Sequence, residues 1–359
     1  MSDAEWDPDA FRVRVQGALE EFLDEQAVRL APLGDDAARL LAEARASVSG
    51  GKRFRAAFCY WGFRAVAGSD HDEEREADLV RACASLELLH ASALVHDDYM
   101  DASDTRRGRP ATHRGFAEEH RRDGWRGDPE QYGASAAILL GDLLLSWSDE
   151  LLRRCGLPLE RVAAALDLLD RCRSEVITGQ FLDVSVQARG AADVDAAMTV
   201  LRYKSAKYSI ERPLHIGAAL AGATEERLRE LSAFGLPLGE AFQLRDDLLG
   251  VFGDPSTTGK PAGDDLVEGK RTVLVALALD GASPADAARL DAALGTDLTE
   301  ADVADLRRII DGSGAHAQVE EVIGRLATTA TDALARADLD ERARGVLLEL
   351  ATAVTHRTL

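Results

Sequence analysis

Aromatic residues, proline and cysteine are scarce in this chain of 359 residues. Phe, Trp and Tyr together make up 5% of it, and it contains 10 prolines and 4 cysteines. Alanine and leucine, both strong helix formers, dominate the remainder. The composition therefore predicts a mostly helical protein.

The cysteines lack the close pairing that a metal site needs, and nothing in the sequence indicates secretion. We therefore expect them to be core thiols in a reducing compartment. The N-terminus is acidic and has no apolar signal region. The longest apolar stretch, residues 136–147, is too short to span a membrane and contains Asp142. We expect a cytoplasmic protein without stable membrane insertion.

Basic residues are also in the minority. Lys and Arg number 42 against 63 Asp and Glu, a formal net charge of −21. Such an acidic chain is a poor partner for nucleic acid or for an anionic membrane surface. In so acidic a chain, basic residues that cluster near aspartates are unlikely to be there as average surface.

Strand-like alternation of useful length is missing, whereas helical periodicity recurs along the chain. We predict an all-α fold and a single domain over residues 1–359, with residues 106–133 as a long loop holding at most one short helix. Ser283 and Thr299 are expected helix caps. The expected helices are at about 9–26, 77–102, 134–155, 159–188, 193–222 and 224–252, with more over 271–359.

Two aspartate clusters end helical runs. The first contains Asp97 and Asp101, one helical turn apart, so their carboxylates share a face and can share a hard cation. Arg106 and Arg107 follow and suit an anion. The second cluster contains Asp246. Taken alone, either cluster could be a solvated helix end, but carboxylates beside arginines suggest a metal-bound phosphate or diphosphate.

Several further motifs appear in order with these clusters. The motifs are Gly50-Gly51-Lys52-Arg53-Phe54-Arg55, Glu87-Leu88-Leu89-His90, Asp97-Asp98-Tyr99-Met100-Asp101, Arg106-Arg107-Gly108, Gly179-Gln180-Phe181-Leu182-Asp183, Lys204-Ser205-Ala206, Phe242-Gln243-Leu244-Arg245-Asp246-Asp247 and Gly259-Lys260. Together they closely resemble the trans-isoprenyl diphosphate synthase (polyprenyl synthetase) family, over about residues 48–272, and most resemble a bacterial geranylgeranyl diphosphate synthase.

The resemblance implies an all-α isoprenoid-synthase-type bundle around a central prenyl channel. It implies head-to-tail condensation of an allylic diphosphate with isopentenyl diphosphate, in which the developing charge of the leaving diphosphate must be stabilised. It also implies three Mg²⁺ ions, for which Mn²⁺ could substitute, and a homodimer.

The family positions also imply a role for each site residue. Asp97, Asp101 and Asp246 match the metal ligands, with Asp98 in the same catalytic motif. Arg106, Lys204 and Lys260 match contacts to the allylic diphosphate, and Lys52, Arg55, His90 and Arg107 match those to isopentenyl diphosphate. Gln180 and Lys270 are further substrate-binding positions, and Ser205 and Gln243 match positions near the reacting carbons.

The second cluster departs from the family pattern. Much of the family has a third aspartate where this chain has Gly250. If Asp246 is the principal ligand, the loss is tolerable, Asp247 and Asp265 can help through water, and Gly250→Asp should have a small effect. Otherwise the chain would bind metal weakly or be a non-catalytic regulatory subunit.

The resemblance also leads to expectations for the length of the product and for the class of reaction. The family's chain-length positions before the first aspartate hold Ser92 and Ala93, both small, which predicts a geranylgeranyl (C20) product, with C25 or longer as the alternative. A class I terpene cyclase would also ionise a prenyl diphosphate with Mg²⁺. The residues matched to a second diphosphate argue against it.

Overall fold

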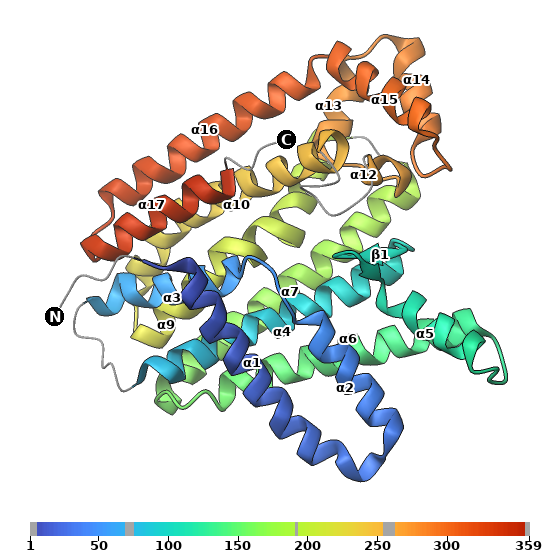
Figure 1. Cartoon of the computed structure of the whole chain (residues 1–359). Coiled ribbons are helices and arrows are strands. Elements are labelled where there is room, and N and C mark those ends of the chain that lie inside the picture. Colours follow the sequence, from blue (N-terminus) through green and yellow to red (C-terminus); the bar gives the residue numbers. More distant parts are fainter. Residues whose placement is uncertain (1–5, 69–74, 191–192, 254–262, 356–359) are drawn as a thin grey trace. The chain divides into compact units, whose positions relative to one another are not determined.

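The computed structural model describes residues 6–68, 75–190, 193–253 and 263–355. The chain divides into two compact units. Unit 1 comprises Met1–Leu166 and Ile216–Gly222, and unit 2 comprises Asp167–His215 and Ala223–Leu359. In the described ranges both are built from helices, apart from one two-stranded hairpin (Figure 1). The all-α prediction is confirmed, and the single domain stays a prediction.

Unit 1 holds the N-terminal helices and the hairpin. Two helices, α7 (Leu159–Arg189) and α9 (Arg212–Ala221), contribute residues to both units. The other elements of unit 1 are α1 (Pro8–Leu30), η1 (Ala31–Leu33), α2 (Asp35–Ser47), α3 (Phe54–Ala67), α4 (Glu76–Met100), β1 (Thr105–Arg106), β2 (Arg109–Pro110), α5 (Thr112–Arg122) and α6 (Pro129–Arg153).

The first helix begins where the sequence predicts. The Asp7 side chain accepts hydrogen bonds from two backbone amides of the first turn of α1, and Pro8 takes the first helical position. An apolar stripe at helical spacing is buried, from Phe11 through Val15 and Leu19 to Phe22. Local capping and helical periodicity therefore suffice to explain this element.

Helix α4 forms the centre of unit 1. It packs against α1, α3, α5 and α6, and its apolar side chains are buried around most of its circumference. Such a helix is a rigid support for polar residues at its end. The four cysteines are buried thiols, as predicted.

Unit 2 is built around α10, which packs against α16, α17 and the π-helix η4. Ser283 caps α14, and Thr299 forms a capping box with Asp302 at the start of α15, so both predicted caps are confirmed. The remaining elements of unit 2 are α8 (Val194–Val200), η4 (Leu201–Glu211), α10 (Glu225–Phe252), α12 (Asp264–Val267), α13 (Val273–Gly281), α14 (Pro284–Ala293), α15 (Glu300–Gly312), α16 (Ala315–Arg336) and α17 (Glu341–Thr355).

Two segments differ from the sequence-based expectation. The expected loop at 106–133 contains the hairpin, the eleven-residue α5 and the start of α6. The expected continuous helix at 193–222 is interrupted by the π-helical turns of η4. Both differences affect residues assigned to the site.

Among the helices of the described ranges, none is both long and apolar enough to cross a bilayer.

Candidate functional site

The hairpin that carries Arg106 and Arg107 belongs to unit 1. Thr105 pairs with Pro110 and Arg106 with Arg109 in antiparallel register. The turn residues Arg107 and Gly108 both have positive φ, 52° and 73°, as a type I′ turn requires. This turn fixes the direction in which the two arginines leave the backbone.

Asp98 holds Arg106 in place. Its carboxylate is buried at the end of α4 and accepts a hydrogen bond from Arg106 Nε at 2.8 Å, with a second from Nη2 to the same oxygen. A buried carboxylate needs such a partner. Of the first aspartate motif, Asp98 therefore orients the arginine predicted to contact the allylic diphosphate.

Asp97 and Asp101 lie at the C-terminal end of α4. The Asp101 amide donates to the Asp97 carbonyl at 2.8 Å, which places the two residues one turn apart, as predicted. The last turn of α4 contains no basic residue. Because the C-terminal end of a helix carries partial negative charge, carboxylates there are unfavourable unless a cation compensates them.

The loop before α3 lies against the hairpin turn. Arg107 Nη1 donates to the Ser49 carbonyl at 2.8 Å. A Cβ atom at Gly51 would come within 3.3 Å of Arg107 Nη2, so a glycine at this position leaves room for the guanidinium. These contacts join the segment containing Lys52 and Arg55 to Arg107.

Arg53, between those two basic residues, is buried and has a left-handed φ of 56°. Its Nη1 lies 3.0 Å from Glu87 Oε2, and its Nη2 donates to Gln16 Oε1 at 2.5 Å and to the Val48 carbonyl. The other Glu87 oxygen accepts from the Ala56 amide in the first turn of α3 at 3.3 Å. Glu87 therefore fixes the loop before α3.

His90 lies in a strongly positive environment. Burial lowers its pKa well below the usual range, and the charges of Arg55, Arg107, Arg106 and Arg53 lower it further. The pKa of Arg107 is also lowered, by burial first and then chiefly by Arg53. Cations that depress one another's charged forms generate a potential that an anion would relieve.

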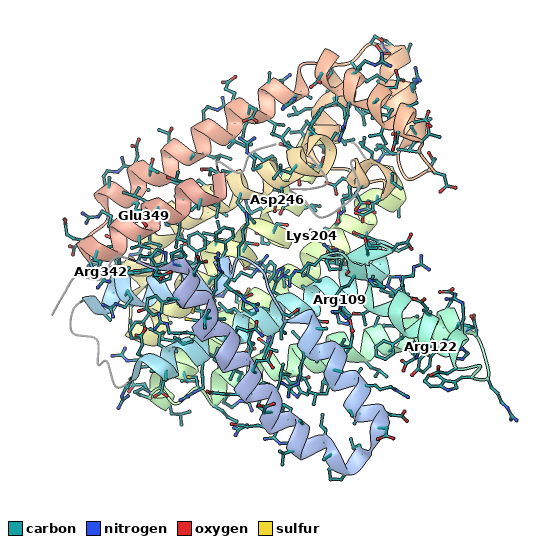
Figure 2. The ribbon with its side chains drawn as sticks, viewed as in Figure 1. Arg109, Arg122, Lys204, Asp246, Arg342 and Glu349 are labelled. Atoms are coloured by element: carbon teal, nitrogen blue, oxygen red, sulfur yellow. The ribbon has the colours of Figure 1, made fainter. Side chains whose placement is uncertain are left out.

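In unit 2, Lys204 and Ser205 lie on η4, and Figure 2 shows Lys204 there and Asp246 on α10. Lys204 Nζ is 2.6 Å from Asp183 Oδ2 on α7. Gln180, on the same helix, is partly exposed. The pair Lys204–Asp183 thus joins two of the predicted motifs.

Two glycines allow close approach to η4. A Cβ at Gly179 of α7 would overlap the Lys204 amide and lie 2.7 Å from the Tyr203 carbonyl carbon. A Cβ at Gly239 of α10 would lie 2.5 Å from the Ala206 carbonyl oxygen. The backbone that carries Lys204 and Ser205 is therefore packed tightly on two sides, and π-helical turns of this kind are frequent at functional sites.

The second aspartate cluster lies on α10. Gln243 Nε2 donates to Asp247 Oδ1 at 2.8 Å. Burial first, and then the charges of Asp265 and Asp246, raise the pKa of Asp247 to about 8, against the lowering effect of the Gln243 hydrogen bond. Asp246 is less buried. Lys270 Nζ pairs with Asp265 at 3.3 Å and with Glu268 at 2.5 Å, and Lys260 lies outside the described residues.

Comparisons with known proteins agree with these motifs. The polyprenyl synthetase family matches residues 38–311. A geranylfarnesyl diphosphate synthase of Aeropyrum pernix is 34% identical over 270 residues, which is 74% of this chain and 77% of that protein. The chain belongs to the polyprenyl synthetase family. It is an isoprenyl diphosphate synthase, and therefore a prenyltransferase.

Two further relatives are named for different products, geranylfarnesyl and geranylgeranyl diphosphate. A geranylfarnesyl diphosphate synthase of Natronomonas pharaonis is 36% identical over 205 residues, 57% of this chain and only 55% of that protein. A crystal structure of geranylgeranyl pyrophosphate synthase from Corynebacterium glutamicum, complexed with isoprenyl diphosphate and magnesium, is 41% identical. It superposes with a TM-score of 0.95 and covers 98% of this chain and 100% of that one.

The structure of this polyprenyl synthetase also shows supporting residues to which the sequence analysis gave no site role. Arg53 with Glu87, and Asp183, hold residues of the predicted site. Glu175 pairs with Arg212 through two hydrogen bonds of 2.7 Å and with Lys207 at 3.2 Å, next to η4. Glu87 and Asp183 fall within motifs that the sequence analysis quotes, but their partners become visible only in the structure, and Glu175 lies outside those motifs.

Proposed function

We propose that the chain condenses isopentenyl diphosphate with an allylic diphosphate head to tail and releases geranylgeranyl diphosphate, a C20 product. The observation that carries this proposal is the group of arginines around His90. In a chain of net charge −21, four arginines that lower the pKa of one half-buried histidine support a site for an anion.

In this proposal Lys52, Arg55, His90 and Arg107 bind isopentenyl diphosphate. The lowered pKa keeps His90 neutral near pH 7, so it can donate a hydrogen bond to a phosphate oxygen without adding charge. Arginine forks suit phosphate oxygens bidentately. This diphosphate needs no metal of its own because these side chains supply the compensating charge.

Asp97, Asp101 and Asp246 are the proposed magnesium ligands. Magnesium prefers oxygen ligands and usually takes one or two carboxylates together with substrate oxygens and water. Within the described ranges, no three His, Cys, Asp or Glu side chains gather to hold a metal ion by themselves, which fits ions shared with a diphosphate. Three bound ions would supply the positive charge that stabilises the departing diphosphate.

The remaining assignments concern the allylic substrate. Arg106, which Asp98 orients, would contact its diphosphate together with Lys204 and Lys260, while Gln180 and Lys270 complete substrate binding. The carboxylate at Asp183 aims Lys204, and the packing of η4 fixes its backbone. Ser205 and Gln243 would place neutral dipoles near the reacting carbons, where a carbocation forms and a strong nucleophile would trap it.

Ser92 and Ala93 on α4 support the C20 product. Ser92 is buried and Ala93 is partly buried, one turn before His96 and Asp97 respectively. Small side chains at these positions leave more length for a prenyl tail than aromatic ones would. The relatives named geranylfarnesyl synthases make C25 the outcome to test against it. We also propose a homodimer, because the resemblance to the family implies one.

The test is the product of the wild-type protein incubated with Mg²⁺, isopentenyl diphosphate and each allylic primer, separated by chain length. A C20 product supports the proposal, and a C25 product overturns the assigned length. Pyrophosphate release without elongation would indicate a cyclase, and complete inactivity a non-catalytic subunit.

Asp97→Ala and Asp246→Ala should each lower turnover by orders of magnitude, and near-normal rates would refute the metal assignment.

A further inference from the structure

One face of α7 contacts the π-helix η4 at successive turns. Glu175, Gly179 and Asp183 are spaced four residues apart, so they lie in line along this face of the helix. The Asp183 carboxylate is 2.6 Å from Lys204 Nζ, and a Cβ atom at Gly179 would overlap the Lys204 amide nitrogen. The first half of η4 is therefore held against α7 by an ion pair and by close backbone packing.

Glu175 holds the other end of η4. Its two oxygens each accept a hydrogen bond of 2.7 Å from Arg212, the first residue of α9, one from Nε and one from Nη2. Lys207 Nζ, on η4 itself, donates to Glu175 Oε1 at 3.2 Å. A guanidinium fork on a carboxylate fixes orientation as well as distance. The segment that carries Lys204 is therefore attached to α7 at two places, about two helical turns apart.

The contacts of Glu175 continue into unit 2. Burial raises the pKa of Glu175, but the hydrogen bonds from Arg212 and the charges of Arg212 and Lys207 outweigh it and hold the pKa below its usual range. Arg212 Nη1 lies 3.1 Å from Nδ1 of His215, whose other ring nitrogen is 3.0 Å from Ser232 Oγ on α10. Glu175 thus anchors a chain of polar contacts from α7 through α9 to α10.

Helix α10 packs against the backbone of η4 as well. A Cβ atom at Gly235 would lie 3.2 Å from the Cα atom of Glu211, and one at Gly239, a turn later, 2.5 Å from the Ala206 carbonyl oxygen. Close packing of this kind limits how far η4 can shift away from α7. A rotation of η4 would have to break its ion pairs to α7.

We propose that Glu175 is a positioning residue for the allylic diphosphate and that it acts through Lys204. The pair of Lys204 with Asp183 alone would leave η4 able to turn about that contact. By holding Lys207 and Arg212, Glu175 adds the second attachment that removes this freedom and keeps the Lys204 ammonium group in place. This inference rests on the proposed function, which makes Lys204 a contact of the allylic diphosphate.

The test measures binding rather than turnover. Farnesyl diphosphate, an allylic diphosphate, is titrated into the full-length protein with Mg²⁺ and without isopentenyl diphosphate, by isothermal titration calorimetry. Glu175→Gln removes the charge at nearly constant volume and should weaken binding about tenfold, the scale of one hydrogen bond to a charged group. Lys204→Ala, which removes the contact itself, should weaken binding at least as much.

A double variant separates positioning from a general loss of stability. If Glu175 acts through Lys204, Glu175→Gln/Lys204→Ala should bind within about twofold of Lys204→Ala alone. Losses that add in full would overturn the inference. In steady-state kinetics, Glu175→Gln should raise the KM for the allylic primer and leave the KM for isopentenyl diphosphate within about twofold of wild type. An equal rise of both KM values would also overturn it.

Asp305→Asn is the matched control. Its carboxylate is buried and pairs with Arg289 and Arg308, but it lies on α15, which packs against α13, α14 and α16. This variant should bind farnesyl diphosphate like wild type. Wild-type binding by Glu175→Gln, or an equal loss in Asp305→Asn, would contradict the proposal. If Glu175→Gln does not fold, Arg212→Lys, which keeps the charge but not the fork, replaces it in the single and double variants.

The two proposals fail in different ways. A wild-type protein that binds farnesyl diphosphate but does not elongate it would overturn the proposed function, while the binding measurements would still decide the role of Glu175. A wild-type protein that does not bind an allylic diphosphate would overturn both.

Discussion

Arg53, in the loop before α3, combines a left-handed backbone with a buried charge. A left-handed φ at a non-glycine residue costs about 1 kcal/mol or more, and its burial requires a compensating charge. Glu87 supplies that charge and also binds the first turn of α3. The residue therefore sets the backbone path on which Lys52 and Arg55 depend.

Glu87→Gln should destabilise the protein strongly, because it leaves the Arg53 charge buried without its partner. The two side chains are 4% and 3% exposed, and breaking such a pair costs about 3–5 kcal/mol. Urea denaturation measures the loss. The control is Glu321→Gln, whose pair with Arg325 is 71% and 67% exposed and should matter by less than about 1 kcal/mol. Equal effects of the two substitutions would contradict this account.

His215 should make stability depend on pH. Burial lowers its pKa to about 4, while its ring contacts Arg212 and Ser232. Below pH 6.5 the unfolded chain binds a proton that the folded one does not, so stability falls as pH falls towards 4. The loss between pH 7 and pH 5 should be about 2 kcal/mol.

Urea denaturation of wild type and His215→Asn at both pH values isolates this contribution. The variant should lose correspondingly less stability on acidification. A wild-type and a variant protein with the same difference between pH 7 and pH 5 would show that His215 is not responsible.

At the scale of elements, the π-helix η4 depends on glycines in its neighbours. Gly239→Ala would push a methyl group against the Ala206 carbonyl oxygen, at 2.5 Å, and backbone cannot rotate aside. We expect a loss of about 1–3 kcal/mol, as overpacking causes, and a lower rate because Lys204 and Ser205 move. Gly324→Ala on α16 is the control, since its Cβ would meet nothing within 4 Å and should stabilise by about 0.5–1 kcal/mol. Denaturation midpoints and turnover rates of both variants test this prediction. A Gly239→Ala variant with wild-type stability and turnover would contradict the packing argument.

Helix α4 should set product length through its last turns. Ala93→Phe places an aromatic ring one turn before Asp97, where it would shorten the space for a prenyl tail. The expected result is a shift from C20 towards shorter products, measured by chromatography. Ala77→Phe, at the exposed start of the same helix, should leave the product unchanged. An unaltered product distribution for Ala93→Phe would place the channel floor elsewhere.

Elements with local signals are predictable from the sequence, and those set by tertiary contacts are not. The cap at Asp7, the stripe on α1 and the caps of α14 and α15 all follow from residues within a few positions of one another. The hairpin has only the Arg107-Gly108 turn as a signal, and its strands are two residues long. The π-helix arises where Gly179 and Gly239 admit close backbones from distant segments.

The same division holds for the candidate site. Motif positions predict which side chains carry charge, such as Asp97 and Arg107. They do not reveal that Asp98 orients Arg106 or that Glu87 holds Arg53, because those pairs form only once helices and loops pack. The packing of the Asp265 carboxylate against Gly250 is another contact that the sequence does not reveal, since the two positions are fifteen residues apart.

For the molecule as a whole, the excess of negative charge should couple metal and diphosphate binding. Pyrophosphate alone adds negative charge to a chain of −21, and in the part of the chain that the structure describes no three His, Cys, Asp or Glu side chains gather to hold magnesium by themselves. Together they should raise the melting temperature by more than the sum of their separate effects; at one hundred times the dissociation constant, binding stabilises by about 2.7 kcal/mol. Thermal denaturation with each component alone and with both checks this. Additive shifts would argue against a shared site.

Because the native cysteines are buried, their rate of labelling by a thiol reagent should report local unfolding of the protein. All four thiols lie out of solvent, and burial raises the pKa of Cys83 and Cys155, which suppresses the reactive thiolate. A thiol reagent added to the native enzyme should therefore react only as fast as these regions unfold. A single cysteine introduced on the surface would label first and alone, which makes this chain suited to site-specific attachment of probes without removing any native residue.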